Sequence, residues 1–145
     1  MKRTISAQLD ASPDRVFEVL ADLGTYVNWL DLVTRSEPAT PVAADTGPAW
    51  VVTLRAKVGP LARSKRLRMV RTHTRRPDTV LFERAEVDDR DHSSWLLNVD
   101  IAGAGPCDVQ VDLTYQGTLW TAPLGAILRA QADDAVPRLQ ALVAD

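Results

Sequence analysis

The sequence predicts an α+β fold in which a curved antiparallel sheet wraps around one long C-terminal helix. Residues 120–145 carry apolar side chains at steps of three and four, which is the period of an amphipathic helix. Between residues 49 and 116, apolar and polar residues alternate in runs separated by short turns, as in half-buried strands that pair antiparallel. Such a sheet has one apolar face, and only the terminal helix is long enough to cover it.

Composition limits the classes of protein to which the chain can belong. With 145 residues, it has the length of a single domain, and we expect residues 1–145 to form one. The net charge of -2 gives no general attraction to nucleic acid or to membranes. A single cysteine, Cys107, cannot form an internal disulfide, and the first residues lack the apolar core of a signal peptide. We therefore expect a cytoplasmic protein.

The first part of the chain predicts one strand followed by two short helices. Apolar and polar residues alternate over residues 4–10, which indicates a half-buried strand. Ser12 is a good helix N-cap and Pro13 suits the first helical position, so a helix is expected to begin there and to end near Gly24. Thr25 is expected to cap the second helix, which continues to about residue 30.

The remaining strands and the final helix follow from residue periodicity. Prolines and a glycine make residues 38–48 a loop. The strands predicted from alternation span residues 49–58, 65–75, 80–87, 95–101 and 107–116. A turn is expected at residues 59–61, and Pro137 is expected to kink the terminal helix because proline lacks an amide donor.

Several motifs resemble those of one superfamily. They are Ser12-Pro13-Asp14-Arg15-Val16-Phe17, residues 22–29, Gly59-Pro60-Leu61 before a basic strand, Phe82-Glu83-Arg84, and the terminal helix. Their order resembles the helix-grip fold of the START-like, Bet v 1-like (SRPBCC) superfamily, and in particular bacterial polyketide cyclase/dehydrase and lipid-transport proteins. The resemblance covers essentially the whole chain. It implies two short helices after the first strand and a cavity between sheet and helix, and it brings no shared catalytic signature.

Large apolar side chains are predicted to point toward the covered face of the sheet. In an ordinary core they fill volume, whereas around a cavity they shape it and stack on a flat ligand. The resemblance favours the cavity. The candidate ligand-binding residues are Trp29, Trp50, Leu54, Met69, Phe82, Trp95, Leu97, Val111, Leu113, Tyr115, Leu124, Ile127 and Leu128.

His73, Arg84 and Glu86 are the candidates for acid–base chemistry. A tight turn at Pro77-Asp78 would place His73 opposite Phe82, on the face that also carries Arg84 and Glu86. An arginine there would hold an anionic oxygen at one end of the cavity. The alternative is a solvated strand edge on which acids and bases pair, and a register shift of one residue would reverse every assignment.

Other polar features predict no additional cofactor or partner. Seven of the 17 Lys and Arg residues lie between Arg63 and Arg76, but without an aromatic platform for nucleic-acid bases. His73 and His92 lack further ligands at metal-site spacing, so no metal or other cofactor is expected. Leu61 and the residues from Trp120 to Leu124 would touch a membrane transiently if they flank a pocket mouth.

Two main hypotheses follow from these residues and the resemblance. The first is a protein that binds or carries a lipid-like, quinone-like or polyketide-like molecule in the cavity. The second is an enzyme of the polyketide cyclase/dehydrase type that uses acid–base residues in the same cavity. A third is an interaction module that acts through a protein partner. The chain is expected to be a monomer or a homodimer.

Overall fold

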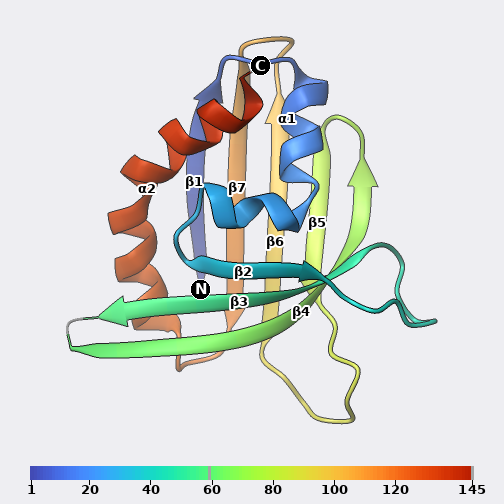
Figure 1. The fold of residues 1–145 in the computed structure, drawn as a ribbon, viewed down its shortest axis with the longest axis vertical. Coiled ribbons are helices and arrows are strands. Elements are labelled where there is room, and N and C mark those ends of the chain that lie inside the picture. The colour runs from blue at the N-terminus through green and yellow to red at the C-terminus, as the bar shows by residue number, and fades with distance from the viewer. Residues whose placement is uncertain (59, 145) are drawn as a thin grey trace.

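The computed structural model describes residues 1–58 and 60–144, and it contains one curved antiparallel sheet with three helical segments (Figure 1). The sheet has seven strands in the order β1-β7-β6-β5-β4-β3-β2. The strands are β1 (Lys2–Leu9), β2 (Val33–Pro38), β3 (Ala49–Val58), β4 (Leu61–Arg75), β5 (Thr79–Arg84), β6 (Ser94–Ala102) and β7 (Cys107–Gln116). The helices are α1 (Pro13–Leu20), the 3-10 helix η1 (Leu23–Asn28) and α2 (Thr121–Val143). This arrangement confirms the predicted fold class.

Curvature of the sheet encloses the long helix. β1 pairs with β7 rather than with its neighbour in sequence, so β1 and β2 form the two edges. In Figure 1, β2, β3 and β4 cross the direction of β1, β7 and β6, and α2 lies beside β1. Contacts of α2 with β1, β3 and α1 show that it bridges the two halves of the bent sheet. The concave face is therefore covered by helices and the convex face is not.

Aromatic side chains fill much of the concave face. Trp29 and Phe82 have no exposed surface and Trp95 is 1% exposed. Ring centroids lie 5.7 Å apart for Trp50 and Phe82 and 4.6 Å apart for Trp95 and Tyr115, which are separations typical of favourable aromatic pairs. Each such side chain contributes roughly 1.5–3 kcal/mol through burial, so these rings form the strongest part of the core.

The two short helices begin and end at capping side chains. Oγ of Ser12 accepts a hydrogen bond from the amide of Arg15 at 3.2 Å, which confirms the predicted start of α1. The predicted boundary between the helices is wrong. Asp22, not Thr25, caps η1, because its carboxylate accepts from the amide of Gly24 at 2.8 Å. The hydroxyl of Thr25 instead donates to the carbonyl of Val19 at the end of α1.

One additional strand and two strand boundaries differ from the sequence-based prediction. The strand β2 was not predicted, because it is mostly exposed and a bulge between Val33 and Arg35 disturbs its alternation. The strand β5 ends at Arg84 rather than at residue 87, and β4 begins at Leu61 rather than at residue 65. The final helix α2 continues through Pro137. Gly59 of the predicted turn and Asp145 of the predicted helix lie outside the described residues.

A buried ion pair holds the loop between β2 and β3 against the convex face. The guanidinium of Arg68 lies 2.6 Å from Oδ2 of Asp45, and both side chains are less than a tenth exposed. Arg68 also donates to the carbonyls of Thr40 and Ala85. The hydrogen bond from Arg68 lowers the pKa of the Asp45 carboxyl to about 2. One of the basic residues of β4 thus has a structural role.

Candidate functional site

A small apolar chamber lies between the concave face of the sheet, η1 and α2. Its volume is about 60 Å³. The residues that line it are Arg3, Ile5, Leu23, Tyr26, Leu30, Leu32, Val33, Val52, Leu54, Leu67, Met69, Trp95, Leu97, Val111, Leu113 and Leu128. Alternation along the strands brings these side chains together, because every second residue points to the concave face.

The polar atoms of the aromatic lining residues already donate hydrogen bonds to acceptors of the protein. The hydroxyl of Tyr26 donates to the carbonyl of Leu20 at 2.8 Å, and burial raises the pKa of this phenol above its ordinary value. Nε1 of Trp95 donates to Oγ of Ser93 at 3.2 Å. The chamber therefore presents carbon, and its one charged lining residue is Arg3, whose side chain is exposed.

About half of the candidate ligand-binding residues line this chamber. Those that do are Leu54, Met69, Trp95, Leu97, Val111, Leu113 and Leu128. The others are buried in the core but not at the chamber: Trp29, Trp50, Phe82, Tyr115, Leu124 and Ile127. Sequence reasoning missed Ile5 and Leu67, although alternation in β1 and β4 placed them on the concave face, and it missed Arg3, which lies outside the strand predicted over residues 4–10. It also missed Val33, because the strand that carries it was not predicted.

The chamber is smaller than a typical ligand site. Pockets for small molecules usually measure about 300–1,000 Å³, so the space seen here has to widen before it admits such a ligand. Trp120 is 4% exposed and Leu124 is not exposed, and both belong to the core. These two side chains therefore offer no exposed apolar surface beside the chamber. Leu119, which precedes them, is 68% exposed.

The structure brings together two of the three acid–base candidates. Nε of Arg84 lies 2.7 Å from Oε2 of Glu86, and Arg84 pairs across the sheet with Met69, which lines the chamber. His73 is exposed and lies opposite Leu81. A register shift between Arg71 and His73 changes the expected pairing, so the predicted position of His73 opposite Phe82 is wrong.

All three nitrogens of the Arg84 guanidinium have partners in the protein. Its side chain is 7% exposed, Nη1 donates to the carbonyl and hydroxyl of Ser93, and Nη2 lies 3.3 Å from Nδ1 of His92. Nε2 of His92 in turn lies 2.7 Å from Asp88. These bonds fix the segment between β5 and β6. Burial, and then the charge of Arg84, lower the pKa of nearby Lys65.

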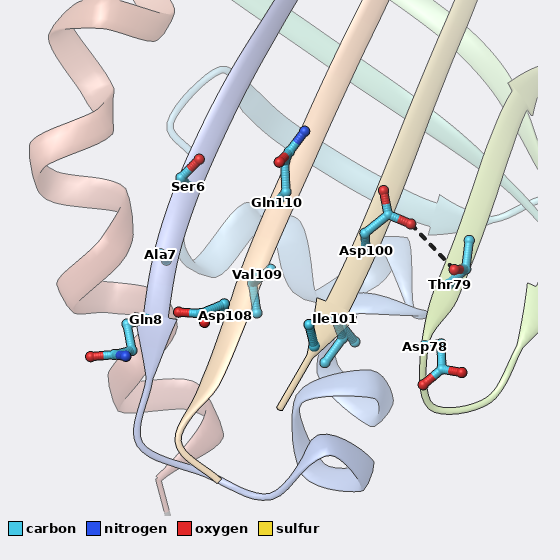
Figure 2. A pocket seen from close by; sticks show the side chains of 11 residues that line it. Ser6, Ala7, Gln8, Asp78, Thr79, Asp100, Ile101, Asp108, Val109 and Gln110 are labelled. Atoms are coloured by element: carbon cyan, nitrogen blue, oxygen red, sulfur yellow. Dashed lines mark hydrogen bonds between the residues drawn. The ribbon is translucent and has the colours of Figure 1, made fainter. Parts of the chain in front are cut away.

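A larger hollow lies on the opposite, convex face of the sheet. It measures about 550 Å³ and is formed by β1, β7, β6 and β5 (Figure 2). Figure 2 shows polar side chains along it, including Gln8, Asp108 and Gln110, and a hydrogen bond of 3.2 Å from Thr79 to Asp100. Because this trough is open to solvent, it would bury little of an apolar ligand.

Three further features bear on function: possible metal ligands, possible membrane-spanning helices and the single cysteine. Within residues 1–58 and 60–144, no three His, Cys, Asp or Glu side chains are grouped closely enough to hold a metal ion. None of the described helices is long and apolar enough to cross a membrane. Cys107 is buried, its thiol donates to the carbonyl of Ala11, and burial raises its pKa. A thiol in this state is a poor nucleophile.

Comparison with known proteins assigns the family. The sequence profile of the family described as "Polyketide cyclase / dehydrase and lipid transport" matches residues 2–144. The chain belongs to this family. A comparison with curated proteins finds no match.

Solved structures share the fold at low sequence identity. A START superfamily protein from Mycobacterium smegmatis is 12% identical with a TM-score of 0.68, and the match covers 98% of this chain and 96% of that one. Ginseng major latex-like protein 151 from Panax ginseng is 10% identical with a TM-score of 0.68, covering 100% and 98%. The di-domain ARO/CYC BexL from the BE-7585A biosynthetic pathway is 11% identical with a TM-score of 0.65, covering 100% of this chain and 50% of that one. These similarities support the helix-grip, START-like fold of this family member.

Proposed function

We propose that this family member binds or carries a hydrophobic small molecule, lipid-like, quinone-like or polyketide-like, in the chamber between the sheet and α2. Residues 1–145 act in this proposal as one ligand-binding domain. The observation that carries it is the carbon-lined chamber, which six strands, η1 and α2 jointly leave unfilled. A void of about 60 Å³ costs roughly 1.4 kcal/mol at about 24 cal/mol per Å³, and an apolar ligand would recover that cost.

Ligand entry requires the chamber to widen, and the first half of α2 is the element best suited to move. Trp120 is the N-cap of α2, and its side chain makes no capping hydrogen bond to the amides of the first turn; its own amide donates a long hydrogen bond of 3.4 Å to the hydroxyl of Tyr115. The first turn also lacks an acidic residue that would favour the helix dipole. This end of α2 is held mainly by apolar contacts of Leu124, Ile127 and Leu128, which a ligand would replace with contacts of its own.

The proposal is tested by titrating the protein with the neutral dye N-phenylnaphthylamine. The wild type should give saturable fluorescence. Leu113→Trp, which places a large ring in the chamber wall, should abolish it, whereas Leu81→Trp on the convex side of β5 should bind as the wild type does. Extraction of the denatured protein followed by mass spectrometry would identify a ligand retained from the cell. Absence of saturable binding, or equal binding by Leu113→Trp, would overturn the proposal.

The alternative is an enzyme of the cyclase/dehydrase type. The ion pair of Arg84 and Glu86, whose side chains are 7% and 19% exposed, favours it because Arg84 lies opposite the chamber residue Met69 in the sheet. In this alternative Glu86 moves a proton of a bound polyketide-like chain while Arg84 holds the carboxylate in place. Glu86→Gln should then abolish turnover of a polyketide-like substrate, while His73→Ala, exposed on β4, retains it. Full activity of Glu86→Gln would exclude this role.

The remaining properties stay predictions from the sequence. These are the cytoplasmic location, the transient membrane contact and the monomeric or homodimeric state. Exposure of Leu119 supports a membrane contact at the start of α2, and sedimentation of the protein with lipid vesicles would test it.

A further inference from the structure

We propose that Arg3 binds the anionic group of an amphiphilic ligand, such as a carboxylic acid with an apolar body, while the apolar body occupies the chamber. This inference rests on the proposed function, because it needs the chamber to accept a ligand. It adds the chemical class of that ligand and a residue that selects it.

Arg3 lies at the edge of the chamber, between β1 and α2. Side chains of β1 alternate between the two faces of the sheet, so Arg3 lies on the concave face with Ile5, whereas Ser6 lies on the convex face. Arg3 pairs across the sheet with Leu113. Its guanidinium rests against Gly125 of α2, where an added Cβ would lie 3.3 Å from Nη2 and 3.6 Å from Nε. A glycine at this position thus leaves room for the cation between the strand and the helix.

Within the described residues, the guanidinium of Arg3 donates one hydrogen bond and has further N–H donors available. Nη1 donates to the carbonyl of Lys2 at 3.0 Å, which uses one of the five N–H groups of a guanidinium. Among the described residues, no carboxylate lies within ion-pair distance of Arg3. Arg68 and Arg84, in contrast, each have a carboxylate partner at 2.6–2.7 Å. Arg3 is therefore free to bind an anion that is not part of the protein.

The rest of the chamber cannot recognise a polar group. The hydroxyl of Tyr26 and Nε1 of Trp95 donate to protein acceptors, and the other lining side chains are hydrocarbon or thioether. A carboxylate that pairs with Arg3 through two parallel hydrogen bonds would orient the ligand with its apolar part inward. Arg129 donates to the carbonyl of Gly125 at 3.0 Å and adds a second positive charge on the same turns of α2.

The test compares two dyes that differ in one charged group. Anilinonaphthalene sulfonate carries a sulfonate that N-phenylnaphthylamine lacks, and dodecanoate and dodecanol serve as competitors that differ in the same way. Arg3→Gln should weaken binding of the sulfonate dye and of dodecanoate by about fivefold, which is the effect of losing one charge-assisted contact near solvent. Binding of the neutral dye and of dodecanol should not change.

Controls separate this inference from the proposed function. Arg55→Gln removes one charge from the exposed side of β3 and should leave all four affinities as in the wild type. Arg3→Lys should restore part of the anion affinity. Equal affinities of wild type and Arg3→Gln for dodecanoate would overturn the role of Arg3 while binding of the neutral dye still supports the chamber. If neither dye binds the wild type, the proposed function fails as well, and circular dichroism shows whether each variant is folded.

Discussion

Adding one methylene group to the chamber should stabilise the protein. Val111 on β7 lines the chamber and is 4% exposed, so Val111→Ile places the extra carbon in empty space. Burial of a methylene contributes about 0.8 kcal/mol. For a chain of this length, that corresponds to a rise in Tm of about 2–3 °C, measurable by thermal denaturation followed by circular dichroism.

The matched control lies directly across the sheet. Val99 on β6 is the pairing partner of Val111 and is fully buried, but it does not line the chamber. Val99→Ile should therefore overpack the core and lower the stability by about 1–3 kcal/mol. If Val111→Ile destabilises the protein as much as Val99→Ile does, the space beside Val111 is not available, and the argument for a ligand chamber fails.

Three further substitutions test individual contacts. Ser12→Ala removes the N-cap of α1 and should cost about 1 kcal/mol, seen as a Tm lower by about 2–4 °C, and an unchanged Tm would mean that the cap contributes nothing. Because the pKa of Asp45 falls from 3.8 to about 2 on pairing with Arg68, its carboxylate stabilises the folded state above pH 4 and loses this effect as the pH falls toward 2. Asp45→Asn should therefore show a weaker loss of Tm over that range than the wild type, and an identical pH dependence would contradict the assignment. His73→Ala should leave both Tm and binding of N-phenylnaphthylamine unchanged, since His73 is exposed, and a tenfold loss of affinity would place His73 at the ligand.

Regular alternation made the later strands predictable. In β6 and β7, inward and outward residues follow one another without interruption, and this correctly placed Leu97, Val111 and Leu113 on the concave face. The same rule failed at His73, because a register shift of the kind a bulge produces cannot be recognised from residue types alone.

The charged end of the chamber was not predictable in the same way. Arg3 reads in the sequence as part of a basic N-terminus, and its position at the chamber follows only from the pairing of β1 with β7 and from the approach of α2 at Gly125. Contacts between residues this far apart in the chain leave no local pattern. Chamber volume is unpredictable for a related reason, since it depends on how the aromatic rings pack against one another.

The distribution of the basic residues explains how a carbon-lined space persists inside a chain rich in charge. Arg68 holds the loop between β2 and β3 from the convex side through Asp45. Arg71 donates to the carbonyl of Ala21 at the end of α1, and Arg76 pairs with Asp14 in the first turn of α1. Each of these cations joins β4, or the turn after it, to a neighbouring segment. The basic strand therefore stabilises the packing of the β2–β3 loop and of α1 against the sheet. The chamber between the sheet and α2 is then lined by apolar side chains, and Arg3 is the charged residue among those that line it.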